Sequence, residues 1–246
     1  MNIMKNYQAI IFDLDGTLIN SLEDIADAMN YTLAAFGFPT HNYDAYRYFV
    51  GNGLMNLVRV SIPQSALENQ HLLQLCFEMM MDKYQKCLIH KTRLYPGMKE
   101  LLDVLTSKKL KMAVLSNKAD QLTQHICNAL LKEWPFDVII GASEDFPRKP
   151  DPNSALFIAK KLNLSPENII YVGDTDIDMK TANAAGMFPV GVTWGFRTKE
   201  ELQKAGAKWI IDKPLELVEK FRKDVRYKNL RSDLNCQFHK FVKPFK

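Results

Sequence analysis

Short apolar runs, each about the length of a β-strand, alternate along this chain with segments long enough to form helices. They occupy residues 9–12, 111–115, 136–140, 169–172, 189–193 and 209–211. Successive parallel strands need a crossover of a dozen or more residues, which is usually helical. Asp151 with Pro152 is typical of a helix start, and Thr198 with Glu201 has the spacing of a capping box. The pattern therefore predicts an α/β fold in which helices flank a parallel sheet.

One interval in this alternation is far too long for a simple crossover. About 99 positions separate Thr17, just after the first run, from Ser116, just after the second. Structureless connections of that length are uncommon within a compact domain, so we expect an inserted domain. The insert joins the rest of the chain near Leu18 and between His90 and Pro96. Two short connections of this kind suit a cap that opens and closes over the sheet edge.

The pattern within the insert is helical. Ser21 and Asp24 have the spacing of a capping box, and apolar residues at helical spacing follow until Gly37. Further helices are expected at 44–50, 54–60 and 65–89. We therefore expect the insert to be all-helical.

Composition and charge narrow the class of protein. The chain has 246 residues and is 47% hydrophobic, which allows a substantial core. Its apolar stretches are strand-sized, and Asp13 comes before any signal-like segment can develop, so we expect a cytoplasmic protein without a membrane partner. Residues 222–246 hold eight Lys or Arg against two Asp, whereas the whole chain has a net charge of +4. A solvated basic tail is therefore favoured over a nucleic-acid-binding face.

Two carboxylates follow the first apolar run. Asp13 and Asp15 are separated by Leu14. Because alternate side chains of a strand point to the same face, both acids can enter one pocket while Leu14 turns away. A turn after a strand explains Asp and Gly at these positions equally well, so the interpretation depends on the rest of the chain.

Polar clusters also follow the next strands, at the sheet edge where open α/β folds bind their ligands. Ser116 and Asn117 come after the second run, Lys149 after the third, and Asp174 and Asp178 after the fourth. The alternating acids of the last cluster could suggest a calcium loop, but Gly at the sixth position and Glu at the twelfth are missing. A magnesium site, which needs only one or two carboxylates with water and phosphate, fits better.

These residue types suggest a phosphoryl-transfer site. A carboxylate such as Asp13, with a usual pKa of about 3.9, is ionised at neutral pH and can attack phosphorus. Asp15 is the candidate that protonates the leaving oxygen and later activates water. Mg²⁺ and Lys149 must offset the repulsion between the nucleophile and a phosphate dianion. The candidate metal ligands are Asp13, Asp15, Asp174 and Asp178.

Other residues are candidates for holding the substrate. The Ser116 hydroxyl and the Asn117 backbone amide can bind phosphate oxygens, and Thr17 can brace the first loop. Taken alone, however, the Ser-Asn pair is more typical of a helix cap. Gly51 and Asn52 can bring the backbone of the insert close to a small anion, but a turn between helices explains the glycine equally well.

The ordered motifs Asp-x-Asp-x-Thr, Ser, Lys and Gly-Asp-x-x-x-Asp, from Asp13 to Asp178, closely resemble those of the haloacid dehalogenase superfamily. The resemblance covers about residues 7–221. It implies a Rossmann-like parallel sheet core, with helices on both faces, and an inserted all-helical cap. We accordingly expect a catalytic core at 1–17 and 91–225, a cap at 18–90, and a basic C-terminal extension at 226–246.

Within that superfamily, residues 49–54, 94–97 and 192–197 look like phosphoglycolate phosphatase sequences. We therefore predict a Mg²⁺-dependent phosphomonoester hydrolase that forms an aspartyl-phosphate at Asp13, with 2-phosphoglycolate as the leading substrate. A pyrophosphatase, a nucleotide or sugar-phosphate phosphatase, and a sugar phosphomutase are the alternatives. A non-catalytic phosphate-binding regulator is an alternative of a different class. The expected partner is a small phosphorylated metabolite, and the expected state is a monomer or homodimer.

Overall fold

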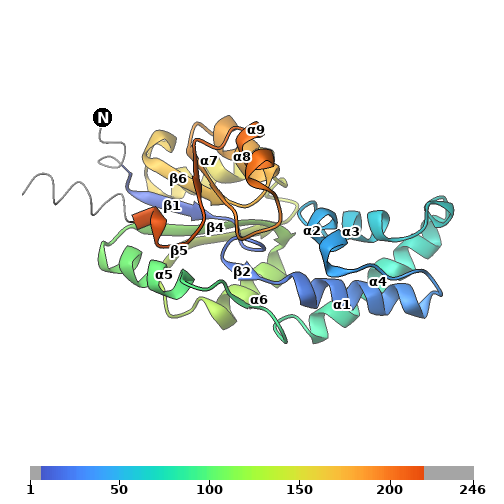
Figure 1. Ribbon diagram of the computed structural model, residues 1–246. Coiled ribbons are helices and arrows are strands. Elements are labelled where there is room, and N and C mark those ends of the chain that lie inside the picture. The colour runs from blue at the N-terminus through green and yellow to red at the C-terminus, as the bar shows by residue number, and fades with distance from the viewer. Residues whose placement is uncertain (1–6, 219–246) are drawn as a thin grey trace, which may run out of the picture.

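Strand β1 (Ala9–Phe12) lies in the middle of the sheet that organises the molecule (Figure 1). The computed structural model describes residues 7–218. The strands around β1 are β4 (Lys111–Ala119), β5 (Phe136–Ala142), β6 (Ile169–Gly173), β7 (Phe188–Val192) and β8 (Trp209–Ile211). The order is β5-β4-β1-β6-β7-β8, and every neighbouring pair is parallel. The predicted parallel sheet is confirmed.

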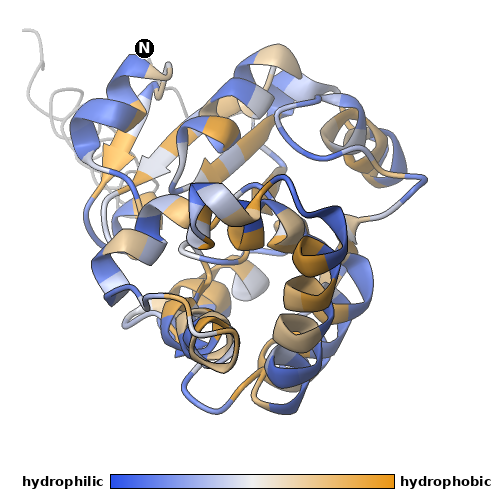
Figure 2. Cartoon of the chain, turned by 90° about the vertical axis from the view of Figure 1, so that its right-hand side faces the viewer, coloured by the Kyte–Doolittle hydropathy of each residue, from blue (hydrophilic) through white to orange (hydrophobic). Residues whose placement is uncertain are grey.

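The sheet is buried on both faces. In β1, Ile10 and Phe12 join one apolar cluster, whereas Ala9 and Ile11 join another on the opposite face. The first face is covered by α5 (Met98–Ser107) and α6 (Asp120–Leu130), and the second by α7 (Asn153–Leu162) and α8 (Asp176–Ala184). Figure 2 shows helices that alternate between hydrophobic and hydrophilic colours, as one-sided burial of a helix requires. The short α9 (Lys199–Lys204) packs against β7 and β8.

The insert, expected at residues 18–90, forms a separate group of helices, on the right in Figure 1. It consists of α1 (Leu22–Ala35), α2 (Tyr43–Phe49), α3 (Leu54–Ser61), a 3-10 turn (Gln64–Ala66) and α4 (Gln70–Lys86). The two connecting segments pair with each other as a short antiparallel ribbon of β2 (Ile19–Asn20) and β3 (Arg93–Leu94). The chain therefore leaves and re-enters the core at one point.

The expected capping box at the start of α1 is wrong. Ser21 occupies the N-cap position, but its side chain makes no capping bond and its hydroxyl donates instead to Asp15 Oδ1. The Asp24 carboxylate is buried and accepts from the backbone N–H groups of Lys91 and Thr92 and from the Thr92 hydroxyl. Tertiary partners thus replace the local capping bonds, and those of Asp24 fix α1 against the segment that precedes β3.

Two other helix starts differ from the prediction by a few residues. Helix α4 begins at Gln70, after Asn69, whose side chain accepts from the Leu72 N–H, and not at residue 65. Before α7, Pro152 stands at the N-cap position itself and not at the first helical residue. The capping box at the start of α9 is confirmed, because the Thr198 and Glu201 side chains bond reciprocally.

Some expected boundaries lie outside the described residues. These are residues 1–6, the last part of the core at 219–225 and the basic extension at 226–246. Within residues 7–218, no helix is both long enough and apolar enough to cross a membrane.

Candidate active site

The carboxyl ends of the central strands bring the predicted residues to one edge of the sheet. Asp13 directly follows β1, and Asp174 directly follows β6. Strand β4 continues to Ala119, so Ser116 and Asn117 lie within the strand and do not cap a helix. Lys149 reaches the same edge from the loop between β5 and α7. The topology therefore assembles residues that are far apart in sequence, as expected for an open α/β sheet.

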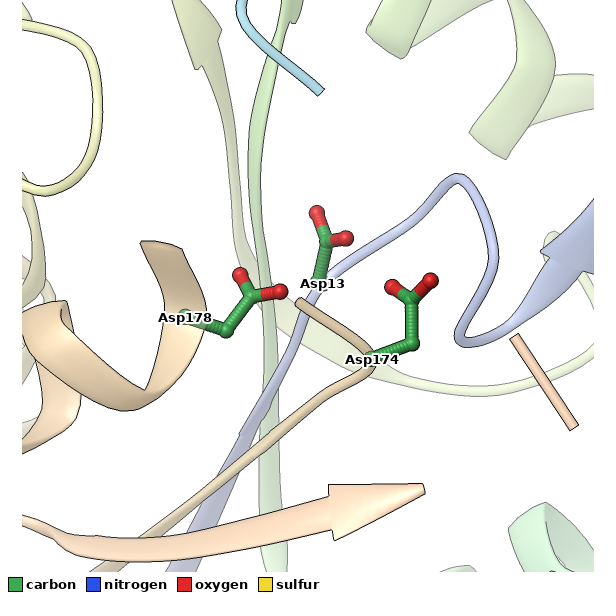
Figure 3. A group of neighbouring side chains, drawn as sticks. All are labelled: Asp13, Asp174 and Asp178. Carbon is green, nitrogen blue, oxygen red and sulfur yellow. The ribbon is translucent and has the colours of Figure 1, made fainter. Parts of the chain in front are cut away.

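Three carboxylates gather beyond the end of β1, as Figure 3 shows. Asp13, Asp174 and Asp178 each offer an oxygen, and these oxygens all lie within 4.8 Å of one another. All three side chains are buried. Carboxylate oxygens are the protein ligands that Mg²⁺ prefers, so this group fits a hard divalent cation.

Lys149 supplies a positive charge to this acidic group. Its Nζ lies 2.7 Å from Asp13 Oδ1 and 2.6 Å from Asp178 Oδ1. The Asn117 side chain holds the Lys149 backbone at both ends, because Asn117 Oδ1 accepts from its N–H and Nδ2 donates to its carbonyl oxygen. Asn117 Nδ2 also donates to the carbonyl oxygen of Gly51 in the insert. One amide thus joins the Lys149 loop, β4 and the insert.

The acids are not balanced by Lys149 alone. Burial, reinforced by the charge of Asp178, raises the pKa of Asp13 well above its usual value, although Lys149 opposes this rise. Burial and Asp178 likewise raise the pKa of Asp174 to about 7. Burial alone would lower the pKa of Lys149, but Asp13 and Asp178 outweigh it and the pKa is raised. Burial and the neighbouring acids thus favour the protonated form of Asp13, whereas Lys149 favours its carboxylate, and a bound cation would favour the carboxylate further.

Asp174 is held in a closely fitted cradle. Thr17 donates its hydroxyl to Asp174 Oδ1 at 3.0 Å, and the Phe196 N–H donates to Oδ2 at 2.7 Å. Gly16 has a φ of +88°, and a Cβ there would lie 2.2 Å from Asp174 Oδ2. A Cβ at Gly195 would lie 2.2 Å from Asp174 Cβ. Two glycines are thus required for this carboxylate to fit, and Thr17 braces it as well as its own loop.

Asp178 lies in the first turn of α8. Its Oδ2 accepts from the backbone N–H and the hydroxyl of Thr175, which completes the capping box of that helix. Its Oδ1 accepts from Lys149 Nζ. The position and orientation of Asp178 are therefore set by the helix start.

Asp15 lies outside the group of three acids. Its Oδ1 accepts from the Ser21 hydroxyl at 2.5 Å and from Lys118 Nζ at 2.7 Å. The group of acids whose oxygens lie within 4.8 Å of one another does not include Asp15, so its role as a metal ligand stays a prediction. Two donors thus hold Oδ1, and Asp15 lines the pocket.

Two residues at the site were not assigned a role from the sequence. Lys118 is buried, and its Nζ donates to Asp15 Oδ1 and to the Tyr84 hydroxyl, each at 2.7 Å. The position of Lys118 directly after the Ser-Asn pair was a usable signal. Tyr84, on α4, carried none, because a buried tyrosine on an amphipathic helix is typical of a core residue.

A pocket opens between the sheet edge and the insert. Its lining includes Asp13, Asp15, Ser116, Asn117 and Lys149 from the core. From the insert it includes Ile25, Val50, Gly51, Gly53, Leu54 and Leu57. Of the two insert residues predicted to contact a substrate, Gly51 lines this pocket, whereas Asn52 is exposed and does not. The pocket is therefore acidic and cationic at the sheet edge and mainly apolar toward the insert.

The insert is also fastened to the rim of the Asp174 cradle. Arg47 Nη2 donates to the carbonyl oxygen of Gly195 at 2.6 Å. The Arg197 guanidinium donates to the carbonyl oxygen of Arg47 and lies over the Tyr48 ring, 4.8 Å from its centroid. We call these contacts of Arg47 and Arg197 the arginine latch. These contacts could not be predicted from the sequence, since arginines are common on helix surfaces.

Comparison with known proteins identifies related sequences. The family model described as haloacid dehalogenase-like hydrolase matches residues 10–192. A phosphoglycolate phosphatase from Colwellia psychrerythraea is 30% identical over 219 residues, which cover 87% of this chain and 97% of that protein. A phosphoglycolate phosphatase from Aquifex aeolicus is 32% identical over 189 residues, which cover 77% of this chain and 86% of that protein.

Solved structures agree with the sequence comparison. The crystal structure of a predicted phosphoglycolate phosphatase from Haemophilus somnus has a TM-score of 0.82 and 28% identity, over 88% of this chain and 98% of that one. A haloacid dehalogenase-like family hydrolase from Streptococcus pneumoniae has a TM-score of 0.79 and 28% identity, over 89% of this chain and all of that one. The fold is thus shared with these structures.

Proposed function

Because this chain belongs to the haloacid dehalogenase-like hydrolase family and is a phosphatase, we propose that it hydrolyses 2-phosphoglycolate through a covalent intermediate on Asp13. The substrate follows from the phosphoglycolate phosphatases that the chain resembles over most of its length. The observation that carries the catalytic proposal is the position of Lys149 Nζ, 2.7 Å from Asp13 and 2.6 Å from Asp178, beside Asp174.

In the first step, an oxygen of Asp13 attacks phosphorus. The bond between phosphorus and the bridging oxygen breaks, and that oxygen takes a proton from Asp15 and leaves as the glycolate hydroxyl. Lys149 stabilises the charge on the transferring phosphoryl group. Asp15 is suited to this role because Ser21 and Lys118 hold its Oδ1 and leave Oδ2 for the proton.

In the second step, a water molecule attacks the phosphorus of the aspartyl-phosphate. Asp15, now a carboxylate, takes a proton from that water. The bond from phosphorus to Asp13 breaks, which releases phosphate and restores both carboxyl groups. The chain ends the cycle in the state in which it began.

Mg²⁺ fits the donor set of the site. Asp13, Asp174 and Asp178 are hard oxygen donors gathered within 4.8 Å, and the pKa values of Asp13 and Asp174 are raised by burial and by the negative charge of Asp178. We propose that these residues hold the ion, directly or through water. When bound, Mg²⁺ neutralises the acids and polarises phosphate oxygens.

Backbone and hydroxyl donors near the ends of β1 and β4 can bind phosphate oxygens. The Ser116 hydroxyl accepts from the Lys118 N–H, which leaves its own proton to donate, and we propose that Ser116 and the Asn117 N–H hold phosphate. Thr17 acts through Asp174, and Gly51 lies on the insert side of the pocket. We propose that residues 18–90 form a cap that excludes water when the substrate is bound.

The first test is Asp13→Asn in the purified full-length chain with Mg²⁺ and 2-phosphoglycolate. Loss of the nucleophile should lower phosphate release by more than about 1,000-fold, while the Tm in the presence of Mg²⁺ stays close to that of the wild type. Asp44→Asn, the same change at an exposed position on α2, should leave turnover unchanged.

Two outcomes would contradict the proposal in different ways. Retained turnover in Asp13→Asn removes Asp13 as the nucleophile. A wild-type enzyme that prefers pyrophosphate, a nucleotide or a sugar phosphate to 2-phosphoglycolate keeps the mechanism and rejects the substrate. Recovery of an isomerised phosphate in place of free phosphate identifies a mutase.

A further inference from the structure

The pocket has two buried cationic side chains, and only one is accounted for by phosphate chemistry. Among the residues that line it, Lys149 and Lys118 carry positive charge. Lys149 contacts Asp13 and Asp178 at the phosphoryl end. Lys118 contacts neither of these acids, and its ammonium bonds instead to Asp15 Oδ1. The pocket therefore has a second cation near the residue that protonates the leaving group.

The Lys118 ammonium is fixed but not saturated. Two of its N–H groups donate to Asp15 Oδ1 and the Tyr84 hydroxyl, each at 2.7 Å. An ammonium group has three such donors, and within residues 7–218 the third has no acceptor. The Lys118 side chain is only 2% exposed, so bulk water does not readily supply one. This pocket-lining residue thus has one charged donor without an acceptor among the described residues.

The surroundings of Lys118 favour an anionic partner from the substrate. The part of the pocket toward the insert is lined by Ile25, Leu54 and Leu57, together with Val50. A substrate carboxylate buried against such side chains is strongly disfavoured unless it is paired with a cation. In the proposed mechanism, Asp15 faces the bridging oxygen of the substrate. A substrate group one or two bonds beyond that oxygen would then lie close to Lys118, because Lys118 bonds to Asp15.

We propose that Lys118 binds a carboxylate carried on the leaving group of the substrate, and that the pocket selects small phosphomonoesters with such a carboxylate close to the bridging oxygen. The inference rests on the proposed phosphatase function and assigns the specificity of that site to one residue. Tyr84, from α4, sets the position of the ammonium. Its hydroxyl therefore links the insert to the choice of substrate.

The test compares two substrates of the same length. 2-Phosphoglycolate carries the carboxylate, and 2-hydroxyethyl phosphate has an uncharged hydroxymethyl group in its place. The wild type should prefer 2-phosphoglycolate by about 10- to 100-fold in kcat/KM, the range expected for hydrogen bonds to a charged group. Lys118→Met should reduce this preference to less than about threefold, with Lys118→Arg retaining more of it than Lys118→Met.

The ratio of kcat/KM for the two substrates separates a role of Lys118 in substrate binding from a role in positioning Asp15. Loss of Asp15 positioning alone lowers turnover of both substrates by the same factor, so a preference that survives in Lys118→Met overturns the inference. Lys132→Met, the same change at an exposed site, should leave both rates unchanged. Thermal unfolding of each variant identifies loss of fold, and Lys118→Gln provides a second charge-removing variant if the Met variant does not fold.

Assays of the wild type alone distinguish failure of the proposed function from failure of the role inferred for Lys118. If it hydrolyses neither substrate nor any other phosphomonoester, the proposed function fails. If it hydrolyses phosphomonoesters but treats 2-phosphoglycolate and 2-hydroxyethyl phosphate alike, the phosphatase stands and the role of Lys118 is rejected.

Discussion

Lys149 is the residue on which the charge balance of the site depends most. Its Nζ bridges Asp13 and Asp178, and its side chain is 4% exposed. Such a buried bridge adds little net stability compared with an apolar core, but its loss leaves two acids without a partner. The lysine is therefore kept for the chemistry of the acids it faces.

We expect Lys149→Ala to weaken both phosphate binding and the chemical step. The variant should lose at least about 100-fold in kcat/KM and, in metal-free buffer, about 3 kcal/mol of unfolding free energy, because two buried acids lose their cation. Steady-state kinetics and urea unfolding measure the two effects. Lys160→Ala, at an exposed position on α7, is the matched control. Normal kinetics in Lys149→Ala would reject its role.

The raised pKa of Asp174 gives the metal-free protein a characteristic pH dependence. Its pKa is about 7 in the folded protein, because of burial and Asp178, against an ordinary value of 3.8. The folded state therefore binds this proton more tightly than the unfolded state. Stability from this group is present below pH 3.8, falls as the pH rises through about 7, and is constant above that.

The direction of this pH dependence is tested by the difference in unfolding free energy between the wild type and Asp174→Asn, measured in EDTA at several pH values. We expect the variant to gain relative stability as the pH rises from about 4 to 7. Added Mg²⁺ at pH 8 should raise the Tm of the wild type more than that of the variant. A difference that does not change with pH would show that Asp174 is already ionised in the metal-free fold.

At the scale of elements, strand patterns were more informative than helix starts. The central strands are buried on both faces, so they are continuous apolar runs with sharp ends at Asp13 and Asp174. The start of a helix depends on whether a polar side chain bonds to the helix backbone or to a distant group. Ser21 and Asp24 had the spacing of a local cap, yet they bond to Asp15 and the returning chain. Local spacing cannot reveal such distant competitors.

The arginine latch predicts a coupling between α2 and the Asp174 cradle. Arg47 donates to Gly195, whose neighbour Phe196 donates to Asp174. We expect Arg47→Ala to lower kcat/KM by about 10-fold with a smaller effect on Tm, because a hydrogen bond from a charged group is lost. Arg59→Ala, at an exposed position on α3, should change neither. Equal kinetics in the two variants would show that the latch does not act on the cradle.

At the scale of the whole molecule, the site lies between two parts that the sequence separates. The core supplies the acids and Lys149, and the insert supplies Ser21, Tyr84 and Gly51. Topology brings the strand ends together, so the core half of the site was predictable from the order of motifs. The insert half was not, because its contacts depend on how four helices dock and not on local spacing.

The charges of the site explain why both parts are required. Four acids, Asp13, Asp15, Asp174 and Asp178, face two lysines in the described pocket and its base. In the proposed first step Asp15 carries a proton, so three carboxylates face the two lysines, and a divalent cation would leave the site with a net positive charge. That charge would offset the repulsion between Asp13 and a phosphorylated substrate.

The most direct test of the central claim is to trap the covalent intermediate. The purified protein is mixed with 2-phosphoglycolate labelled with ³²P and with Mg²⁺, quenched in acid within milliseconds, digested and mapped. We predict label on the peptide that contains Asp13, absent from Asp13→Asn, with the label lost during a chase in unlabelled substrate. Full single-turnover hydrolysis without label on that peptide at any quench time would contradict the account.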